Sequence, residues 1–206
     1  MTKPHGAADG DSAPDSSPST CRRCELWEHA TQAVLGEGPR SARLMIVGEQ
    51  PGNDEDLAGR PFVGPAGKLL RELLREAGID PAAVFLTNAV KHFVWELRGK
   101  RRLHKTPQQR HIAACNVWLR EEIARVAPTI IVTLGATALH ATVTERLRVN
   151  EARESSLKSL EGITVIATYH PSAILRAPLP EQKADMRSAL VGDLKRAAKL
   201  AGPHPR

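Results

Sequence analysis

The chain has 206 residues, of which 41% are hydrophobic and 25% charged, and its formal net charge is +6. These proportions are those of an ordinary globular protein with one domain or two small ones. No apolar run reaches the roughly 18 residues that would predict a membrane-spanning helix. The N-terminus also lacks the apolar segment of a secretory signal, so we expect a cytoplasmic protein with no membrane partner.

The two ends of the chain differ from its centre. Residues 1–19 are rich in Ser, Pro, Gly, Asp and Ala and contain almost nothing to bury, so we predict a disordered tail. We expect a single domain over residues 20–201, followed by a short C-terminal tail over residues 202–206.

The chain contains three cysteines, Cys21, Cys24 and Cys115. An odd number in a cytosolic protein argues against a framework of disulfides. The CxxC spacing of the first two suits ligation of a metal or cluster, or redox chemistry. Because this CxxC follows the predicted tail directly, instead of standing between a strand and a helix, ligation is favoured.

The hydrophobic pattern predicts strands that alternate with helices. Strands are expected over 42–48, 84–90, 128–135 and 162–171, and helices over 25–35, 64–78, 108–127, 136–143 and 181–201. This order is typical of parallel strands joined by right-handed crossovers. We therefore predict an α/β fold, a three-layer α/β/α sandwich around a central parallel sheet of about four strands, with a β-like excursion within 146–162.

A basic segment follows the second predicted strand. Residues 91–110 contain seven lysines and arginines against the single acid Glu96, which accounts for the whole net charge. Such a patch suggests a polyanionic partner, most simply nucleic acid, and the alternative is a solvated loop. The stretch "GKRRLHKTP" places His104 among these cations, which disfavour the charged imidazolium and leave a nitrogen lone pair free.

Polar motifs stand where the predicted strands end. In a parallel α/β sheet, ligands bind beyond the carboxyl ends of the strands. "GEQPG" (48–52) follows the first strand, "TNAVKH" (87–92) surrounds the end of the second, and "YHPS" (169–172) follows the last. The end of the third, "LGATA", reads as a plain glycine turn into a helix.

These motifs together resemble the uracil-DNA glycosylase superfamily. The resemblance rests on "GEQPGNDEDLAGRPFVGPAGKLL" (48–70), "LTNAVKH" (86–92) and "HPS" (170–172), and it covers roughly residues 20–200. It is closest to the iron–sulfur family 4 enzymes. The insert "KRRLH" (100–104) is similar to that of the UdgX branch, whose members trap their own product covalently through this histidine.

The resemblance implies a pocket that holds uracil after the nucleotide leaves the base stack. Phe62 would stack on the base, and its alternative role is a core residue beneath a loop. The amide of Asn88 offers both a donor and an acceptor to the edge of uracil, or it merely caps the strand. Gln50 would hydrogen-bond the base through its backbone or side chain.

The resemblance also assigns residues to the cleavage of the glycosidic bond. His170 would donate a hydrogen bond to uracil O2 as negative charge develops there. Glu49 would help to direct the attacking water, and Asp56, chosen over its acidic neighbours by resemblance alone, would position water or the loop. Contacts to the DNA backbone are expected from Lys100, Arg101, Arg102, Lys105, Ser172 and Arg176, although Arg176 could equally be a surface charge.

Three functions remain open for the chain. The first is a uracil-DNA glycosylase whose His104 attacks C1′ of the sugar and cross-links the protein to the abasic site. The second is a turning-over hydrolytic family 4 enzyme in which His104 assists or binds phosphate. The third is a non-catalytic, cluster-bearing DNA-binding module. We expect a monomer that acts on uracil-containing DNA, single- or double-stranded, releases free uracil, and associates with the nucleoid when bound to DNA.

The family 4 pattern has four cysteine ligands, and this chain departs from it at one position. His92, in "VKHF", occupies the place of the third cysteine. The resemblance therefore implies a Cys3His set of Cys21, Cys24, His92 and Cys115 that holds a 4Fe–4S cluster. Zinc is the alternative for the same ligands.

Overall fold

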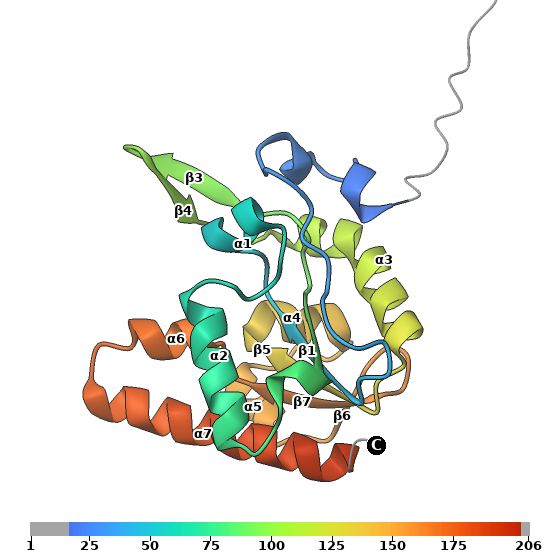
Figure 1. Ribbon diagram of the computed structural model, residues 1–206, viewed down its shortest axis with the longest axis vertical. Helices are drawn as coiled ribbons and strands as arrows, with labels where there is room; N and C mark the ends of the chain where they lie inside the picture. Colours follow the sequence, from blue (N-terminus) through green and yellow to red (C-terminus); the bar gives the residue numbers. More distant parts are fainter. Residues whose placement is uncertain (1–16, 203–206) are drawn as a thin grey trace, which may run out of the picture.

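The computed structural model of the chain describes residues 17–202 (Figure 1). A five-stranded sheet in the order β2-β1-β5-β7-β6 lies between two layers of helices. Four of its strands are parallel: β1 (Leu44–Gly48), β2 (Val84–Asn88), β5 (Ile130–Leu134) and β7 (Thr164–Thr168). The short β6 (Leu157–Lys158) adds an antiparallel edge within the predicted excursion. The predicted three-layer α/β/α fold is confirmed.

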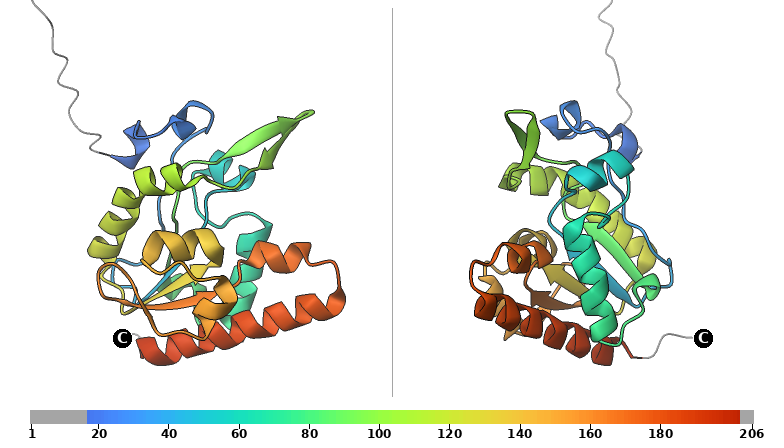
Figure 2. Two further views of the ribbon diagram at one scale, coloured as in Figure 1. Left: turned by 180° about the vertical axis from the view of Figure 1, so that it is seen from behind. Right: turned by 60° about the vertical axis from the view of Figure 1, so that its left-hand side comes forward.

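The alternation of side chains along each strand divides the core into two halves. Met45 and Val47 of β1 face the layer of α3 (Gln109–Val126), α4 (Gly135–Thr142) and α5 (Val149–Arg153). Leu44 and Ile46 face the layer of α2 (Pro65–Glu76), α6 (Pro171–Arg176) and α7 (Pro180–Ala201). The parallel strands are buried along nearly their whole length because helices cover both faces of the sheet (Figure 2).

The prediction of a basic loop after the second strand is wrong, because residues 95–104 form a β-hairpin. β3 (Trp95–Arg98) pairs antiparallel with β4 (Arg101–His104), and the hairpin projects from the body of the molecule (Figure 1). Gly99 makes the two-residue turn possible, because its φ of 62° lies in a region that side chains disfavour. The signal of a glycine turn between two four-residue runs is present in the sequence but is obscured by the density of charge.

Other differences are local. The helix expected over 25–35 is only a 3-10 turn, Glu25–Glu28, and α1 (Asn53–Ala58), α5 and α6 are short helices that the hydrophobic pattern does not mark. Residues 1–16 of the predicted tail lie outside the described residues, and Pro18–Thr20 form a 3-10 turn capped by Ser17. Of the predicted C-terminal tail, only Gly202 is described. None of the helices within residues 17–202 combines the length and apolar character needed to cross a bilayer.

Candidate active site

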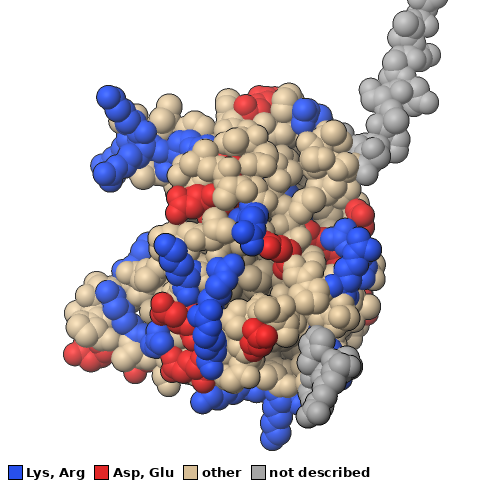
Figure 3. Space-filling model, in the orientation of Figure 1, with Lys and Arg blue, Asp and Glu red and all other residues tan. Residues whose placement is uncertain are grey.

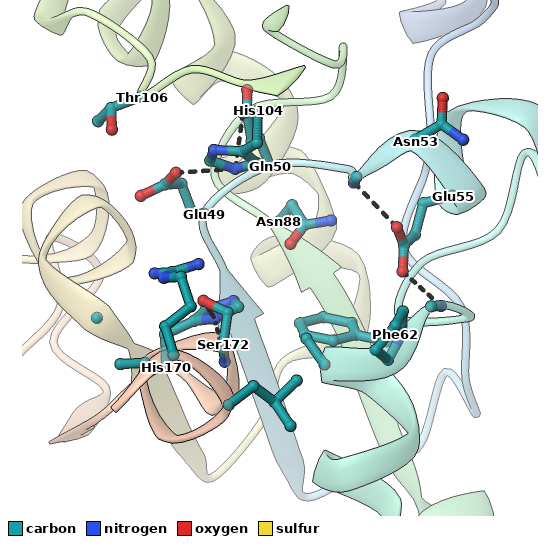
Figure 4. A pocket seen from close by; sticks show the side chains of 18 of the residues that line it. Glu49, Gln50, Asn53, Glu55, Phe62, Asn88, His104, Thr106, His170 and Ser172 are labelled. Carbon is teal, nitrogen blue, oxygen red and sulfur yellow. Dashed lines mark hydrogen bonds and ion pairs between the residues drawn. The ribbon is translucent and has the colours of Figure 1, made fainter. Parts of the chain in front are cut away.

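The carboxyl ends of the parallel strands and the base of the hairpin surround a cavity of about 940 Å³. Glu49, Phe62, Asn88, His104 and His170 all line it, so residues from five separate segments meet at one place (Figure 4). In the space-filling view the molecule is hollowed below the basic hairpin (Figure 3). The sequence-based expectation that the strand-end motifs come together is therefore met by this geometry.

Phe62 and Asn88 lie against each other on one wall of the cavity. A Cβ on Gly48 would lie 2.4 Å from Asn88 Oδ1 and 2.6 Å from Phe62 Cζ, so only glycine at this position lets the two side chains approach. Phe62 has a φ of 56°, a strained backbone for an aromatic residue, and Arg71 Nη1 donates a hydrogen bond to its carbonyl at 2.5 Å. Strain of this kind persists only where neighbouring groups enforce it.

The amide of Asn88 is available to a ligand. Its side chain is 3% exposed, and within the described residues no protein group hydrogen-bonds its amide. A buried amide without partners is costly unless something else fills its hydrogen bonds. Its direction into the cavity (Figure 4) fits a planar base that offers the complementary donor and acceptor.

His170 is held as a neutral donor. It caps the N-terminus of α6, and its Nδ1 accepts a hydrogen bond from the backbone N–H of Ser172 at 3.1 Å, with Ser172 Oγ 2.7 Å away. Because Nδ1 accepts, the single proton of the neutral ring stands on Nε2. Burial, with smaller contributions from Arg176 and His104, lowers the pKa of His170 to about 4. Ser172, expected to contact DNA, thus orients His170 in this structure.

Glu49 links the end of β1 to the hairpin. Its Oε1 lies 3.2 Å from His104 Nε2, and its Oε2 accepts a hydrogen bond from Thr137 Oγ1 at 2.7 Å. The side chain of His104 is 47% exposed and that of Glu49 23%, so solvent or substrate reaches both groups. A carboxylate and an imidazole in this arrangement can orient a nucleophile and accept its proton.

Gln50 lines the cavity, but its side-chain amide is bonded to the base of the hairpin. Its Nε2 donates to the carbonyls of Lys105 at 2.9 Å and Val94 at 3.2 Å, and its Oε1 accepts from Val94 N at 2.9 Å. Both amide hydrogens are then used, although Nε2 also lies 2.9 Å from His104 Nε2. The partner left to that ring nitrogen is Glu49. The expected side-chain contact of Gln50 with uracil is thus not what this structure presents.

Asp56 does not line the cavity, so the expectation that it is catalytic is not met. Its side chain is fully buried and accepts hydrogen bonds from Thr31 N, Thr31 Oγ1 and Arg102 Nη1 at 2.9, 2.6 and 2.7 Å. Asp56 therefore positions the hairpin, which is the structural half of its expected role. The neighbouring Glu55 is the acid that lines the cavity, where it accepts from the backbone N–H groups of Gly52 and Gly64.

The basic patch is smaller than its sequence suggests. Of the seven cations in 91–110, four contact carboxylates: Lys91 with Glu122, Arg102 with Asp56, Lys105 with Glu96, and Arg110 with Glu25. Among the described residues Arg98, Lys100 and Arg101 form no ion pair, and all three are exposed at the tip of the hairpin. Figure 3 shows this blue tip beside the hollow. Arg176 is exposed and lines the cavity itself.

Behind the site lies a buried ion pair of Lys91 and Glu122, and the sequence pattern did not reveal this pair. They are 1% and 3% exposed, and Lys91 Nζ also donates to Thr87 Oγ1 and to the carbonyl of Asn88, both at 2.8 Å. Glu122 also accepts from Gly36 N at 2.8 Å. Only the isolated lysine within an apolar stretch could have indicated it. The network fixes the chain at the point where β2 ends.

The three cysteines gather in the half of the core that contains α3. Burial raises the pKa of Cys115 to about 11, against the opposing effect of Lys91 and with small contributions from the thiols of Cys24 and Cys21. Two donors point at sulfur, since Trp118 Nε1 lies 3.2 Å from Cys21 Sγ and Lys91 N lies 3.2 Å from Cys115 Sγ.

The spacing of these groups bears on what they could hold. Within residues 17–202, no three side chains of His, Cys, Asp or Glu converge on a point where a single metal ion would fit. A zinc ion needs its ligands at about 2.0–2.3 Å from one centre. A cluster binds each ligand to a different iron and therefore accepts a wider spacing. Thiols that accept from N–H donors fit a cluster better than zinc, and His92, the fourth ligand that the resemblance implies, is also buried.

Comparison with known proteins agrees with the geometry. Residues 35–195 match the family model of the uracil DNA glycosylase superfamily. A type-4 uracil-DNA glycosylase of Thermotoga maritima is 39% identical over 178 residues, which cover 86% of this chain and 87% of that protein. Type-4 enzymes of Sulfurisphaera tokodaii and Archaeoglobus fulgidus are 37% and 34% identical, covering 88% and 89% of this chain and 80% and 89% of their own lengths. The chain therefore belongs to the uracil-DNA glycosylase superfamily.

Proposed function

We propose that this protein is a uracil-DNA glycosylase, which cleaves the bond between uracil N1 and C1′ of deoxyribose in DNA. The observation that carries the proposal is the convergence of Phe62, Asn88, His170 and Glu49 on one cavity at the carboxyl ends of the strands. The type-4 relatives, which match most of the chain, support the same activity.

The base enters the cavity after the nucleotide leaves the stack. Its face packs on Phe62, and its N3–H and O4 meet the carbonyl and amino groups of Asn88. Cytosine presents an amino group where uracil presents O4, which would leave two donors facing each other. Rejection of such a base is strong because the polar groups of the site would remain buried and unpaired.

Bond cleavage leaves negative charge on the departing uracil and positive charge on the sugar. His170 donates from Nε2 toward O2 of the base, where that charge develops. A neutral imidazole that only donates a hydrogen bond does not have to regain a proton at each cycle. The lowered pKa of His170 keeps it neutral at physiological pH. Glu49 stands on the sugar side, where a carboxylate stabilises the developing cation.

Two fates of the sugar cation remain, and the comparisons favour hydrolysis. The type-4 relatives support a turning-over enzyme, in which Glu49 orients a water that attacks C1′. In this reaction the water provides the hydroxyl of the abasic sugar and the proton that uracil takes up. The protein is then released unchanged.

A second candidate is covalent trapping, which the position of His104 favours. The imidazole lies on the cavity wall within 3.2 Å of Glu49 and is about half exposed. A ring nitrogen would bond to C1′ as the bond to uracil N1 breaks, uracil would leave with the electron pair, and the ring proton would pass by way of Glu49 or solvent to uracil. An alkylated imidazole is a poor leaving group, so the protein would remain attached to DNA. This is the reaction that the UdgX-like insert implies.

We also propose that Cys21, Cys24, His92 and Cys115 hold a 4Fe–4S cluster. Its support is that Cys21 and Cys115 are buried in one half of the core, that the partly buried Cys24 packs against it, and that His92 is also buried. Replacing one thiolate by imidazole makes the site less negative and raises the reduction potential. In this proposal the cluster links the segment that contains Cys21 and Cys24 to Cys115 of α3. A purified protein that contains zinc in place of iron would refute the proposed cluster.

One gel experiment separates the functions. The protein is incubated with a single-stranded oligonucleotide that carries one uracil, and half of the sample is treated with alkali before denaturing electrophoresis. Alkali-labile DNA without a shifted band indicates hydrolysis with turnover, whereas a heat- and detergent-stable shifted band indicates trapping. A thymine oligonucleotide is the matched control. Trapping through His104 is contradicted if H104A forms as much shifted product as the wild type. If the wild type forms neither product, the remaining function is that of a non-catalytic DNA-binding module.

The proposal extends to the form in which the enzyme works. We expect a monomer that accepts single- or double-stranded uracil-containing DNA and releases free uracil, in the cytoplasm and on the nucleoid. A cavity and a basic arm built from one chain support this expectation.

A further inference from the structure

The two oxygens of the Glu49 carboxylate have separate partners. Oε1 lies 3.2 Å from His104 Nε2, at the edge of the cavity, and Oε2 accepts a hydrogen bond of 2.7 Å from the hydroxyl of Thr137. Glu49 is the first residue after β1, where regular strand pairing ends. Its side chain is therefore held from the far side by Thr137, which belongs to a different crossover.

Thr137 donates its hydroxyl proton to a side chain outside its own helix. It is the fourth residue of the motif "LGATA" (134–138), lies in the first turn of α4, and is 8% exposed. A threonine further along a helix can donate to the carbonyl four residues earlier, as Thr142 does to Ala138 at 2.8 Å, but four residues before Thr137 the chain is still in β5. Thr137 instead donates to a side chain 88 residues away in sequence.

We infer that Thr137 is a positioning residue for Glu49, one that fixes which carboxylate oxygen faces the sugar. The inference rests on the proposed glycosylase function. A carboxylate on a partly exposed side chain can rotate about its last torsion, which is broad. A donor on Oε2 leaves Oε1 directed at the space between His104 and the cavity.

The consequence is the same for both fates of the sugar. In hydrolysis, Oε1 orients the water that attacks C1′. In trapping, Oε1 orients the His104 ring and receives its proton. Proximity effects fall steeply with misplacement, because an error of about 1 Å in a reacting group costs roughly 100-fold in rate. Binding of DNA does not depend on Oε1, so the rate and the affinity should separate.

The test compares three substitutions in α4. T137V removes the hydroxyl at nearly constant volume, T137S keeps it, and T142V removes a buried hydroxyl that bonds within α4 and belongs to a residue outside the cavity lining. Uracil release is followed as free labelled base under single-turnover conditions, which detects hydrolysis and trapping alike. Affinity is measured on an oligonucleotide with a 2′-fluoro uracil sugar, which binds but resists cleavage, and thermal melting verifies folding.

We expect T137V to lose about 10- to 100-fold in the rate of uracil release with unchanged affinity. T137S and T142V should behave as the wild type. T137V at the wild-type rate, or T137S as slow as T137V, would overturn the inference, because the hydroxyl would then do nothing. If T137V does not fold, T137A takes its place under the same criteria. A wild-type protein that releases no uracil refutes the proposed function itself, and the inference falls with it.

Discussion

Gly48→Ala is expected to inactivate the proposed uracil pocket at a smaller cost in folding stability. The new Cβ would stand 2.4 Å from Asn88 Oδ1 and 2.6 Å from Phe62 Cζ. Ordinary van der Waals contact begins near 3.4 Å, so the amide would have to retreat by about 1 Å and the ring by about 0.8 Å. Neither has room, because Asn88 and Phe62 are 3% and 4% exposed and Arg71 holds the backbone of Phe62.

The magnitude follows from the size of the displacement. A shift of about 1 Å in a group that positions the substrate costs roughly 100-fold in kcat/KM, or about 2.7 kcal/mol of transition-state stabilisation. The backbone of Gly48 has no positive φ, so alanine imposes no backbone strain there, but the added methyl overpacks a buried strand, which costs about 1–3 kcal/mol of folding stability. Thermal melting therefore has to show that G48A is folded at the assay temperature before its loss of activity is assigned to the pocket.

The assay is the release of labelled uracil from a single-stranded oligonucleotide, with thermal melting measured in parallel. Gly192→Ala is the matched control, because nothing lies within 4 Å of its added Cβ and the residue is exposed in α7. We expect it to retain full activity. If G48A excises uracil as fast as G192A, then Asn88 and Phe62 do not jointly form the base pocket, and the reasoning from this wall of the cavity is refuted.

Three further predictions address the ion pair, the pH dependence and the DNA contact. Lys91→Met leaves Glu122 charged and buried, so it should reduce the free energy of unfolding by about 3–5 kcal/mol. Urea denaturation measures this free energy, and a loss below about 1 kcal/mol would contradict a tightly coupled ion pair. Burial lowers the pKa of His170 from 6.5 to about 4, so between these pH values the unfolded chain binds a proton that the folded chain does not, and stability should fall by about 2–3 kcal/mol as the pH drops through this window. H170Q should remove that part of the decline, and an unchanged profile in urea titrations at pH 7 and 4.5 would refute it. On single-stranded DNA, Arg101→Gln should make the plot of log K against log salt less steep by about 0.7, whereas Arg102→Gln should change it less because Asp56 already binds Arg102; equal effects of the two would place the DNA elsewhere.

Much of the fold follows from local pattern. The strand cores and the amphipathic helices were predictable because burial on one or both faces leaves a periodic apolar signature in each segment. The hairpin carried its own local signal, the Gly99 turn, but the charged residues on both strands concealed the alternation. The short helices α1, α5 and α6 contain too few residues to establish a period.

The candidate site was predictable only in part. Glu49, Phe62, Asn88, His104 and His170 stand in motifs at strand ends or in the basic insert, and parallel strands bring such ends to one edge of the sheet. The chemistry that each residue type can perform was therefore legible. The sequence did not show which side chains are free to contact a ligand in the cavity. Asp56 and the side chain of Gln50 are two that instead bond to other parts of the protein.

The sequence by itself determined the layered α/β architecture, the meeting of the strand-end motifs and the family resemblance, because hydrophobic period and residue type act within short segments. The tertiary structure alone decided which polar groups satisfy one another. Thr137 reaches Glu49 across 88 residues, and Glu122 reaches Lys91 across 31. A donor finds its acceptor through the packing of distant elements, and burial makes an unmade bond costly. Hydrogen bonds between distant elements are thus properties of the folded chain, whereas local ones, such as that from Ser172 N to His170 Nδ1, lie within one motif.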